Sequence, residues 1–178
     1  VVERGDKLEI GAPCNNFPLD ETAAHSVLLA AGIGITPIIA MADRLHALGR
    51  SFALHYFSRA AEHTAFRKRL AEGGYADKVL FHEGLDVQAT GQALDNILAT
   101  PVADGRVYMC GPAPFMDRAE IAAMAHWPAD AINLERFAAK PAPSGAPTKA
   151  FTVALAPPGL RLLHTSASPD RPPSARIL

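Results

Sequence analysis

Hydrophobic and polar positions follow two periods in turn along residues 26–137. Short apolar runs predict buried strands at HSVLLAAG, SFALHYFS, DKVLFHEG, GRVYMCG and DAINLERFA. Segments with apolar residues at helical spacing separate these runs: TPIIAMADRLHALG, AAEHTAFRKRLAEGG, GQALDNILAT and PAPFMDRAEIAAMAHW. Strands that alternate with helices of about 10–15 residues are typical of βαβ units. We therefore predict an α/β fold over residues 26–138, with a five-stranded parallel sheet flanked by helices.

The segments outside this domain have different patterns. Residues 1–25 contain GDKLEIGAP, which alternates like a strand but has no partner strand before it. Residues 139–150 are rich in Pro, Ala and Ser, a composition that predicts a linker. In residues 151–178, FTVALAPPG predicts one strand and the rest shows no periodic apolar pattern. We expect this last segment to be disordered by itself, and the chain to be truncated at both ends.

The composition excludes several classes of function. About half of the residues are hydrophobic (49%), and 17 basic residues nearly balance 18 acidic ones. This balance favours neither nucleic acid nor an acidic membrane as a partner. The two cysteines cannot form a disulfide framework, and the histidines show no metal-ligand spacing. We expect a cytoplasmic monomer that has no metal site, no membrane segment and no nucleic-acid partner.

The segment AGIGITP lies between the first predicted strand and the first predicted helix. Gly32 and Gly34 can adopt positive φ angles and let a phosphate approach the backbone. Thr36 is a suitable N-cap and Pro37 a suitable first helical residue, so the positive end of the helix would face an anion. The alternative is a tight turn in which glycine is needed for shape alone.

The end of the second predicted strand is HYFSRA. In a doubly wound sheet, Ser58 and Arg59 would lie where the adenosine ribose of a dinucleotide binds. An acidic residue there accepts from the ribose 2′-hydroxyl, whereas arginine accommodates a 2′-phosphate. The alternative is that both residues only cap the helix that follows.

The end of the fourth predicted strand is MCGPAPFM. Here Cys110 and Gly111 precede Pro112, which would start a helix. A small thiol beside a glycine leaves room for a flat ring close to the backbone. The alternative is a buried cysteine that acts as a small hydrophobic residue.

These strand ends together resemble the ferredoxin–NADP reductase superfamily, and more closely its branch of phthalate dioxygenase reductase and vanillate O-demethylase reductase. The resemblance is carried by GAPCNNFPL, HSVLLAAGIGITP, HYFSR, VYMCGPAPFMD, HWP and ERF, in the family's order. It implies three modules: a barrel that carries FMN, a nicotinamide domain, and a ferredoxin domain with a 2Fe-2S cluster. Electrons would pass from NADH through FMN and the cluster to a Rieske-type oxygenase in the catabolism of aromatic compounds.

The resemblance also implies roles for individual residues. Those at the pyrophosphate and the flavin edge are Gly32, Gly34, Ile35, Thr36 and Pro37. Those at the adenosine ribose are Ser58 and Arg59, and those at the nicotinamide are Cys110, Gly111 and Pro112. The candidate catalytic residues are Cys110, which would position the ring, and Glu135. Those beside the flavin are Asn15, Asn16 and Phe137.

The sequence departs from the family in several respects, and almost the whole flavin barrel is absent upstream of Gly5. Cys14 stands where the family has arginine, and the clustered cysteines of a plant-type 2Fe-2S site are absent. We expect residues 1–25 to be the last piece of the flavin barrel and residues 151–178 to be a truncated start of a ferredoxin-like domain.

Three questions stay open on the sequence alone. The family branch prefers NADH, whereas Ser58-Arg59 without an acid at the strand end favours NADPH. The chain could also be a non-functional remnant that folds without catalysing electron transfer. A third hypothesis is an enzyme that uses Cys110 as a nucleophile.

Overall fold

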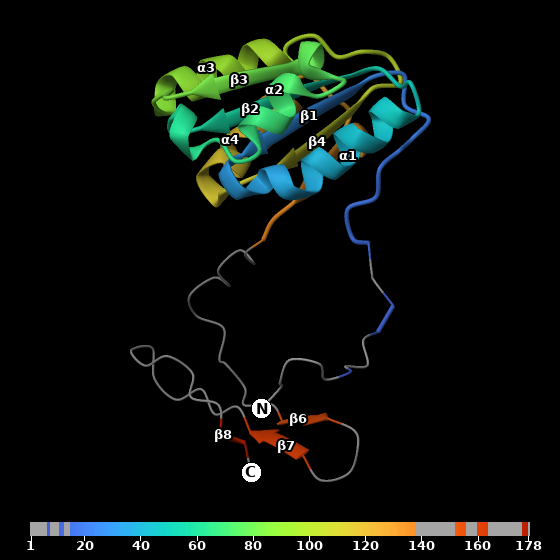
Figure 1. Cartoon of the computed structure of the whole chain (residues 1–178), viewed down its shortest axis with the longest axis vertical. Helices are drawn as coiled ribbons and strands as arrows, with labels where there is room; N and C mark the ends of the chain where they lie inside the picture. Colours follow the sequence, from blue (N-terminus) through green and yellow to red (C-terminus); the bar gives the residue numbers. More distant parts are fainter. Residues whose placement is uncertain are drawn as a thin grey trace. The chain divides into compact units, whose positions relative to one another are not determined.

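The first unit of the chain is an open parallel sheet. The computed structural model describes Lys7, residues 11–12 and 15–137, and the backbone of three short strands within residues 152–177. The chain divides into two compact units, Val1–Ala138 and Ala139–Leu178. The first contains a five-stranded sheet in the order β3-β2-β1-β4-β5, with every neighbouring pair parallel (Figure 1). Its strands are β1 Ser26–Ala31, β2 Phe52–Ser58, β3 Val79–Glu83, β4 Arg106–Cys110 and β5 Ile132–Glu135. The predicted five-stranded α/β fold is confirmed.

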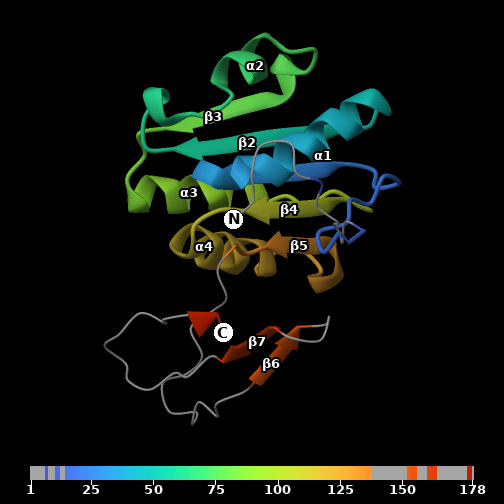
Figure 2. The same cartoon turned by 60° about the horizontal axis from the view of Figure 1, so that its bottom comes forward.

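Helices cover both faces of this sheet. They are α1 Ile35–Ala47, α2 Arg67–Glu72, α3 Val87–Leu98 and α4 Ala113–Met124, with short 3-10 turns at Gly32–Gly34, Ala61–His63, Ala76–Lys78 and Ala129–Ala131. One buried cluster joins α1 and α2 to one face, and a second joins α3 and α4 to the other. Figure 2 shows α1 in front of the strands. Within the described residues, no helix is both long and apolar enough to cross a membrane.

Strand β1 lies at the centre and is buried along its whole length. Leu28 and Ala30 belong to the cluster on the α1 face, whereas Val27, Leu29 and Ala31 belong to the α3–α4 face. Successive side chains of a strand point to opposite faces, so a strand covered on both faces is continuously apolar. This is why the run SVLLAA shows no polar alternation.

Two helices differ from their predicted bounds. Helix α3 begins before the predicted GQALDNILAT, because Asp86 accepts a hydrogen bond from the Ala89 N–H (2.7 Å) and caps it. The predicted helix over AAEHTAFRKRLAEGG is interrupted, since Phe66 has a left-handed φ of 58°. Thr64 has an extended backbone conformation, and its hydroxyl group forms hydrogen bonds with Ser58 at the end of β2 and with Glu83 at the end of β3.

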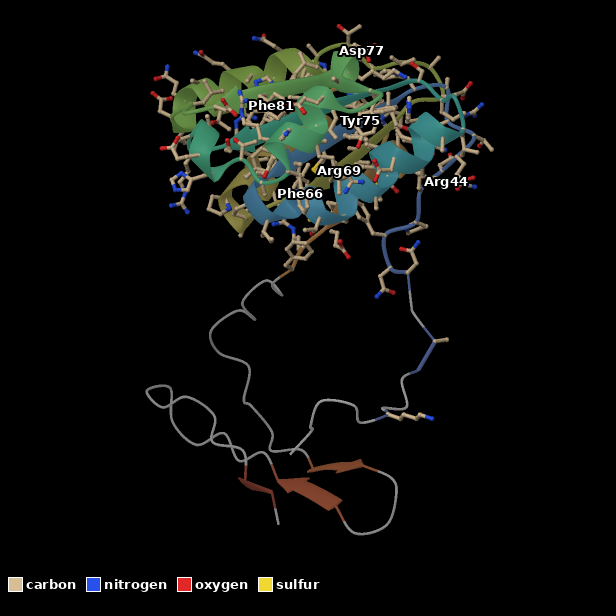
Figure 3. All side chains as sticks on the ribbon, viewed as in Figure 1. Arg44, Phe66, Arg69, Tyr75, Asp77 and Phe81 are labelled. Carbon is tan, nitrogen blue, oxygen red and sulfur yellow. The ribbon has the colours of Figure 1, made fainter. Side chains whose placement is uncertain are left out.

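The short helix α2 is attached to α1 through one aspartate. Asp43 of α1 accepts hydrogen bonds from the Tyr75 hydroxyl (2.7 Å) and from the Arg69 guanidinium. Arg69 and Tyr75 are labelled in Figure 3. Tyr75 also packs edge-on against Phe52 of β2, with 5.6 Å between ring centroids. A helix of this length is not stable alone, so tertiary contacts keep it folded.

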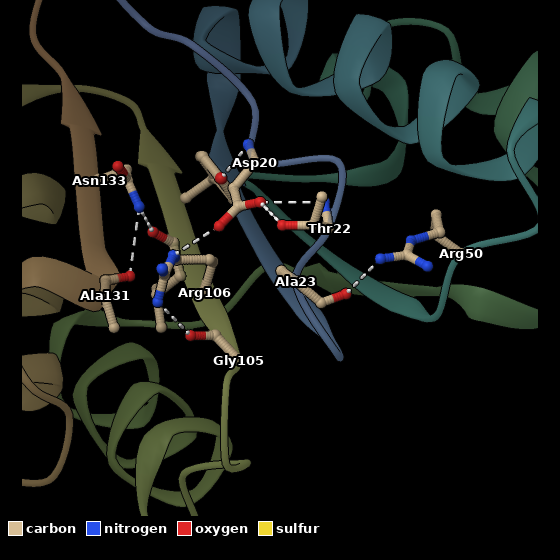
Figure 4. Close-up of polar contacts among 10 residues, drawn as sticks. Asp20, Thr22, Ala23, Arg50, Gly105, Arg106, Ala131 and Asn133 are labelled. Atoms are coloured by element: carbon tan, nitrogen blue, oxygen red, sulfur yellow. Dashed lines mark hydrogen bonds and ion pairs between the residues drawn. The ribbon is translucent and has the colours of Figure 1, made fainter.

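The connector 15–25, which leads into β1, is fastened to the neighbouring strand β4. The Asp20 N–H donates to the Tyr108 hydroxyl (2.7 Å), and Asp20 Oδ2 accepts from Arg106 Nε (3.1 Å; Figure 4). Asp20 Oδ1 also accepts from the N–H of Thr22 (2.9 Å), and Phe17 packs edge-on against Tyr108. The connector therefore has a defined position beside α1 and β4.

The second unit contains three antiparallel strands. They are β6 Thr152–Leu155, β7 Leu160–Leu163 and β8 Arg176–Ile177, in the order β6-β7-β8. Strand β6 lies in the predicted FTVALAPPG, whereas β7 and β8 have no predicted counterpart. Strand formation depends on cross-strand partners, which the residues' own pattern does not reveal. The predicted linker, Cys14 and most of residues 1–14 lie outside the described residues, so the predicted domain remnants stay predictions.

Candidate functional site

The loops after β1 and β4 meet at the carboxyl edge of the sheet. These two strands are neighbours, but β1 leads into α1 on one face and β4 leads into α4 on the other. The point where the chain departs to opposite faces is where open α/β sheets bind their ligands. It brings together the two predicted motifs, AGIGITP and MCGPAP.

Gly34 is required because the two loops touch. A Cβ atom at this position would lie 2.0 Å from the carbonyl oxygen of Cys110 and 2.7 Å from the Gly111 nitrogen. Gly111 is confined as well, since its Cβ would lie 2.9 Å from the Ala31 Cβ and from a ring carbon of Phe115. The backbones of the two loops are therefore in direct contact.

Gly32 serves a different purpose. Its φ is +52°, and a Cβ there would meet nothing within 4 Å. The buried Tyr56 donates its hydroxyl hydrogen to the Gly32 carbonyl oxygen (3.1 Å) and so holds the turn. The left-handed conformation considered for both glycines thus occurs at Gly32, whereas Gly34 has a φ of −61°.

The start of α1 is shifted from its predicted place. Gly34 is the N-cap and Ile35 the first helical residue, so the prediction of Thr36 as N-cap and Pro37 as first residue was wrong. The 3-10 turn Gly32–Gly34 continues directly into the helix, and the Thr36 hydroxyl donates to the Ile33 carbonyl (3.0 Å). No side chain caps this end, and no acidic residue lies in the first turn. The positive end of the helix dipole therefore stays open to an anion.

The side chains of this loop divide into two groups. Ile35 is completely buried and belongs to the core, so only its backbone can contact a ligand. Ile33 is 64% exposed and Thr36 is also exposed. A ligand at this edge would therefore meet backbone, one aliphatic side chain and one hydroxyl.

Cys110 lies at the end of β4 and is fully buried. Burial, with a smaller contribution from the charge of Glu135, raises the pKa of the Cys110 thiol to about 11. The register places Glu135 of β5 directly beside Cys110. A protonated, buried thiol is a poor nucleophile, which argues against an enzyme that uses Cys110 for covalent catalysis.

We expect the Cys110 thiol to react slowly in the folded protein. On a Cys14→Ser background, its reaction with a thiol reagent at pH 8 should be about two orders of magnitude slower than that of a free thiol, because little thiolate is present. In urea the rate should rise to that of a free thiol. Fast modification of the folded protein would contradict the description of Cys110 as buried and protonated.

A groove of about 480 Å³ runs between the connector and α1, with Glu135 in its wall. Asn15, Phe17, Pro37 and Met41 line it as well. The Asn15 side chain accepts a hydrogen bond from the Phe17 N–H (3.0 Å), which stabilises the turn at this wall. Asn15, Pro37 and Glu135, which are predicted site residues, thus lie in one groove.

The chain after β5 is held against α4 by Arg136. Its guanidinium pairs with Asp117 (2.9 Å) and Glu120 (2.7 Å), and its side chain is 15% exposed. The next residue, Phe137, is 54% exposed. The sequence analysis missed this anchor, because both carboxylates lie on a helix distant in the sequence.

The ends of β2 and β3 carry a connected set of polar groups. Ser58 Oγ lies 2.7 Å from Thr64 Oγ1, which donates to Glu83 Oε1 (2.9 Å). Arg67 Nε also donates to Glu83 Oε1 (2.9 Å). Arg59 is exposed. Ser58 does not cap the next helix, since α2 begins after Phe66 without a side-chain cap.

Strand β2 has no acidic residue at its end, but the neighbouring strand β3 has one. Glu83 ends β3 and is the register partner of Ser58. Glu83 was not among the predicted site residues, because it is distant from Ser58 in the sequence and becomes its neighbour only through strand pairing. The register of a parallel pair would have revealed it.

The described residues contain no group of three or more His, Cys, Asp or Glu side chains arranged to hold a metal ion. His55 Nδ1 and His82 Nε2 lie 3.0 Å apart, and the His82 ring stacks on Phe57. Burial lowers the pKa of His55 to about 4, so this ring is neutral at physiological pH, and burial also lowers the pKa of His82. They form a packed pair of rings on the sheet face, and His82 lies directly before Glu83, the last residue of β3.

Comparisons with known proteins show that the chain is similar to a group of reductases. No protein-family model matches the chain. It is 42% identical over 175 residues to tetrachlorobenzoquinone reductase of Sphingobium chlorophenolicum, covering 90% of the chain and 52% of that protein. It is 41% identical over 142 residues to vanillate O-demethylase oxidoreductase of Pseudomonas putida, covering 79% of the chain and 44% of that protein.

One similar solved structure belongs to the same group. The structure of phthalate dioxygenase reductase, described as modular for electron transfer from pyridine nucleotides to [2Fe-2S], matches with a TM-score of 0.66 and 35% identity. The match covers 74% of this chain and 41% of that one. The chain thus spans about half, or less, of the length of the curated relatives named here.

Proposed function

Since the chain belongs to the family of phthalate dioxygenase reductase and vanillate O-demethylase oxidoreductase, we propose that its first unit binds a nicotinamide dinucleotide. The observation that carries the proposal is the contact between the loops after β1 and β4. Because Gly34 packs against the Cys110 carbonyl, the uncapped start of α1 and the end of β4 lie together at one edge of the sheet.

The residues at this edge fit such a nucleotide. Gly32 and Gly34 present backbone without side chains, and the open start of α1 favours the negative charge of a pyrophosphate. The exposed Pro112 follows the buried Cys110 and Gly111, so a flat ring could lie against the backbone of this strand end. Ser58 and Arg59 lie at the end of β2, where the adenosine ribose would bind.

The proposed chemistry is hydride transfer to a flavin. The bound nicotinamide would supply the hydride and a neighbouring FMN would accept it. The protein would position the nicotinamide against the flavin and would exclude water from between them. The buried thiol of Cys110 stays protonated and would support the strand end on which the ring would lie, and Glu135 beside it would provide a negative charge that favours the positively charged oxidised nicotinamide. Phe137 and the Asn15–Asn16 turn would border the flavin.

The intact protein would be the reductase component of a Rieske-type aromatic oxygenase. Relatives carry the names phthalate 4,5-dioxygenase oxygenase reductase subunit and phenoxybenzoate dioxygenase subunit beta, which supports an oxygenase partner. A 2Fe-2S cluster would need cysteines beyond these 178 residues, since they contain two. We further propose a cytoplasmic monomer.

The proposal is tested by titrating the purified chain with NADH and with NADPH, followed by fluorescence or calorimetry. We expect saturable binding of at least one of the two nucleotides with one site per chain. A 5′-AMP titration is a matched control for the adenosine half of the site. If neither nucleotide binds to protein that circular dichroism shows to be folded, the chain is a remnant without a working site.

A second experiment separates an incomplete reductase from a remnant. A related flavin barrel is joined before Gly11, with arginine in place of Cys14, and the absorbance of bound FMN is measured. We expect a yellow protein that loses its colour when NADH is added. A yellow protein that NADH does not bleach would contradict the proposed hydride transfer, although nucleotide binding could still stand.

A further inference from the structure

We propose that Arg136 is a positioning residue: by pairing with Asp117 and Glu120 of α4, it fixes Phe137 at the nicotinamide end of the proposed site. The inference rests on the proposed nucleotide binding and adds a residue that acts on it through another side chain. Arg136 itself touches no ligand in this arrangement, because both of its terminal nitrogens are engaged with α4.

Strand β5 directs alternate side chains to opposite faces of the sheet. Ile132 and Leu134 pack against the buried cluster on the α3–α4 face, whereas Glu135 lies in the wall of the groove beside α1. Arg136 continues this alternation, since its guanidinium reaches carboxylates of α4, the helix that lies beside β5 (Figure 2). The alternation, continued by one residue, directs Phe137 toward the groove.

The register of β5 brings Phe137 close to the proposed nicotinamide position. Glu135 is the register partner of Cys110, at the strand end on which the ring would lie. Neighbouring strands lie about 4.8 Å apart, and each residue of an extended chain advances about 3.3 Å. Phe137 follows Glu135 by two residues, so its backbone lies at most about 7 Å beyond the strand end. Its side chain is exposed and has a free face for a ligand ring.

The pairing of Arg136 is firmer than that of an ordinary surface ion pair. Separate nitrogens of the guanidinium contact Asp117 Oδ1 (2.9 Å) and Glu120 Oε2 (2.7 Å), and the Arg136 side chain is 15% exposed. A single exposed ion pair contributes little, because water screens it and two long side chains must be ordered. A largely buried guanidinium that is held by two carboxylates of one helix keeps a defined geometry.

The helix that holds Arg136 also begins at the nicotinamide loop. Pro112 is the N-cap of α4, and Asp117 and Glu120 lie in the following turns of the same helix. One rigid element therefore carries both the loop under the proposed ring and the carboxylates that hold the residue before Phe137. Arg136 thus fixes the distance between Phe137 and the ring-binding loop.

The test is the Arg136→Gln substitution in the full chain, with NADH and ADP-ribose titrated against wild type and variant. ADP-ribose has the adenosine and the pyrophosphate of NADH but lacks the nicotinamide, so the ratio of the two affinities reports contacts of that ring. We expect Arg136→Gln to change this ratio about fivefold or more, in the same direction as Phe137→Ala. Both variants remove the phenyl ring from its fixed place. The affinity for ADP-ribose should stay within about twofold of wild type.

The double variant distinguishes positioning from a general effect. In the Phe137→Ala background, Arg136→Gln should change the ratio less than about twofold, because the ring that Arg136 positions is absent. Arg136→Lys keeps the charge but lacks the planar fork that reaches two carboxylates, so its ratio should lie between those of wild type and Arg136→Gln. The fluorescence of bound NADH, which depends on the surroundings of the reduced nicotinamide, should change in parallel with the ratio.

Arg118→Gln is the matched control on the same helix. The Arg118 side chain is 35% exposed and pairs with Asp95 of α3, away from the chain after β5. Its substitution removes an ion pair of α4 and should leave the ratio within about twofold. The ratio compares two ligands on one protein, so a general loss of stability does not change it, and circular dichroism shows that each variant is folded.

The outcomes separate the two proposals. If folded wild-type protein binds neither NADH nor ADP-ribose, the proposed function is contradicted, and the role of Arg136 with it. If it binds both, a ratio that Arg136→Gln leaves unchanged, or that Arg118→Gln changes equally, would overturn the role of Arg136 and leave the nucleotide site intact. The same holds if Arg136→Gln has its full effect in the Phe137→Ala background.

Discussion

Replacing Gly34 by alanine is expected to destabilise the domain more than any other single change at the site. The added Cβ would lie 2.0 Å from the Cys110 carbonyl oxygen and 2.3 Å from its carbon. Both are backbone atoms in the end of a buried strand, so no side-chain rotation can relieve the overlap. We expect the free energy of unfolding to fall by about 3 kcal/mol or more, with loss of nucleotide binding. Urea unfolding followed by circular dichroism measures the first effect.

Gly32→Ala is the matched control in the same loop. It introduces a left-handed alanine (φ +52°) but no steric contact within 4 Å, so about 1–2 kcal/mol should be lost. Gly11→Ala, also free of contacts within 4 Å, should be close to neutral. If Gly34→Ala cost no more than Gly32→Ala, the loops after β1 and β4 would not be in contact as described.

Replacing Ile33 by aspartate is expected to change stability and binding in opposite directions. Ile33 is 64% exposed and lies just before α1, whose first turn has no acidic residue. A negative charge at a helix start stabilises the helix by about 0.3–1 kcal/mol. The same charge would repel a pyrophosphate, and we expect NADH affinity to fall about 10- to 100-fold, which corresponds to about 1.4–2.8 kcal/mol.

Ile33→Asn is the control for this change. It has nearly the same shape as aspartate without the charge, and its NADH affinity should stay within a few fold of wild type. Raising the salt concentration should restore part of the affinity of Ile33→Asp, because screening weakens repulsion between exposed charges. An aspartate variant with normal affinity would mean that no anionic group binds at the start of α1.

These substitutions test different properties of one loop. Gly34 allows the two backbones to meet, and Gly32 allows the turn. Substitution of Ile33 tests whether an anionic group binds at the start of α1. Together with Phe137, they divide the site into a pyrophosphate region at β1 and a nicotinamide region at the ends of β4 and β5. A variant in one region should leave recognition in the other unchanged.

Local signals in the chain were sufficient for the architecture. The buried run of β1 and the alternation of strands with amphipathic helices predict a parallel sheet covered on both faces. The AGIGITP segment indicates a close approach to backbone at the first strand end. The start of α3 was also encoded locally, through the Asp86 cap, although the prediction overlooked it.

Contacts between distant segments decided the chemistry of the site. Nothing near Gly34 in the sequence reveals that it lies against the Cys110 carbonyl, because that contact exists only once β1 and β4 are paired. Glu83 likewise became a partner of Ser58 through the register of β2 and β3. Secondary structure follows from short-range patterns of hydrophobicity and backbone preference. The acid, the thiol environment and the glycine contact depend on which distant strands pair with one another and in which register.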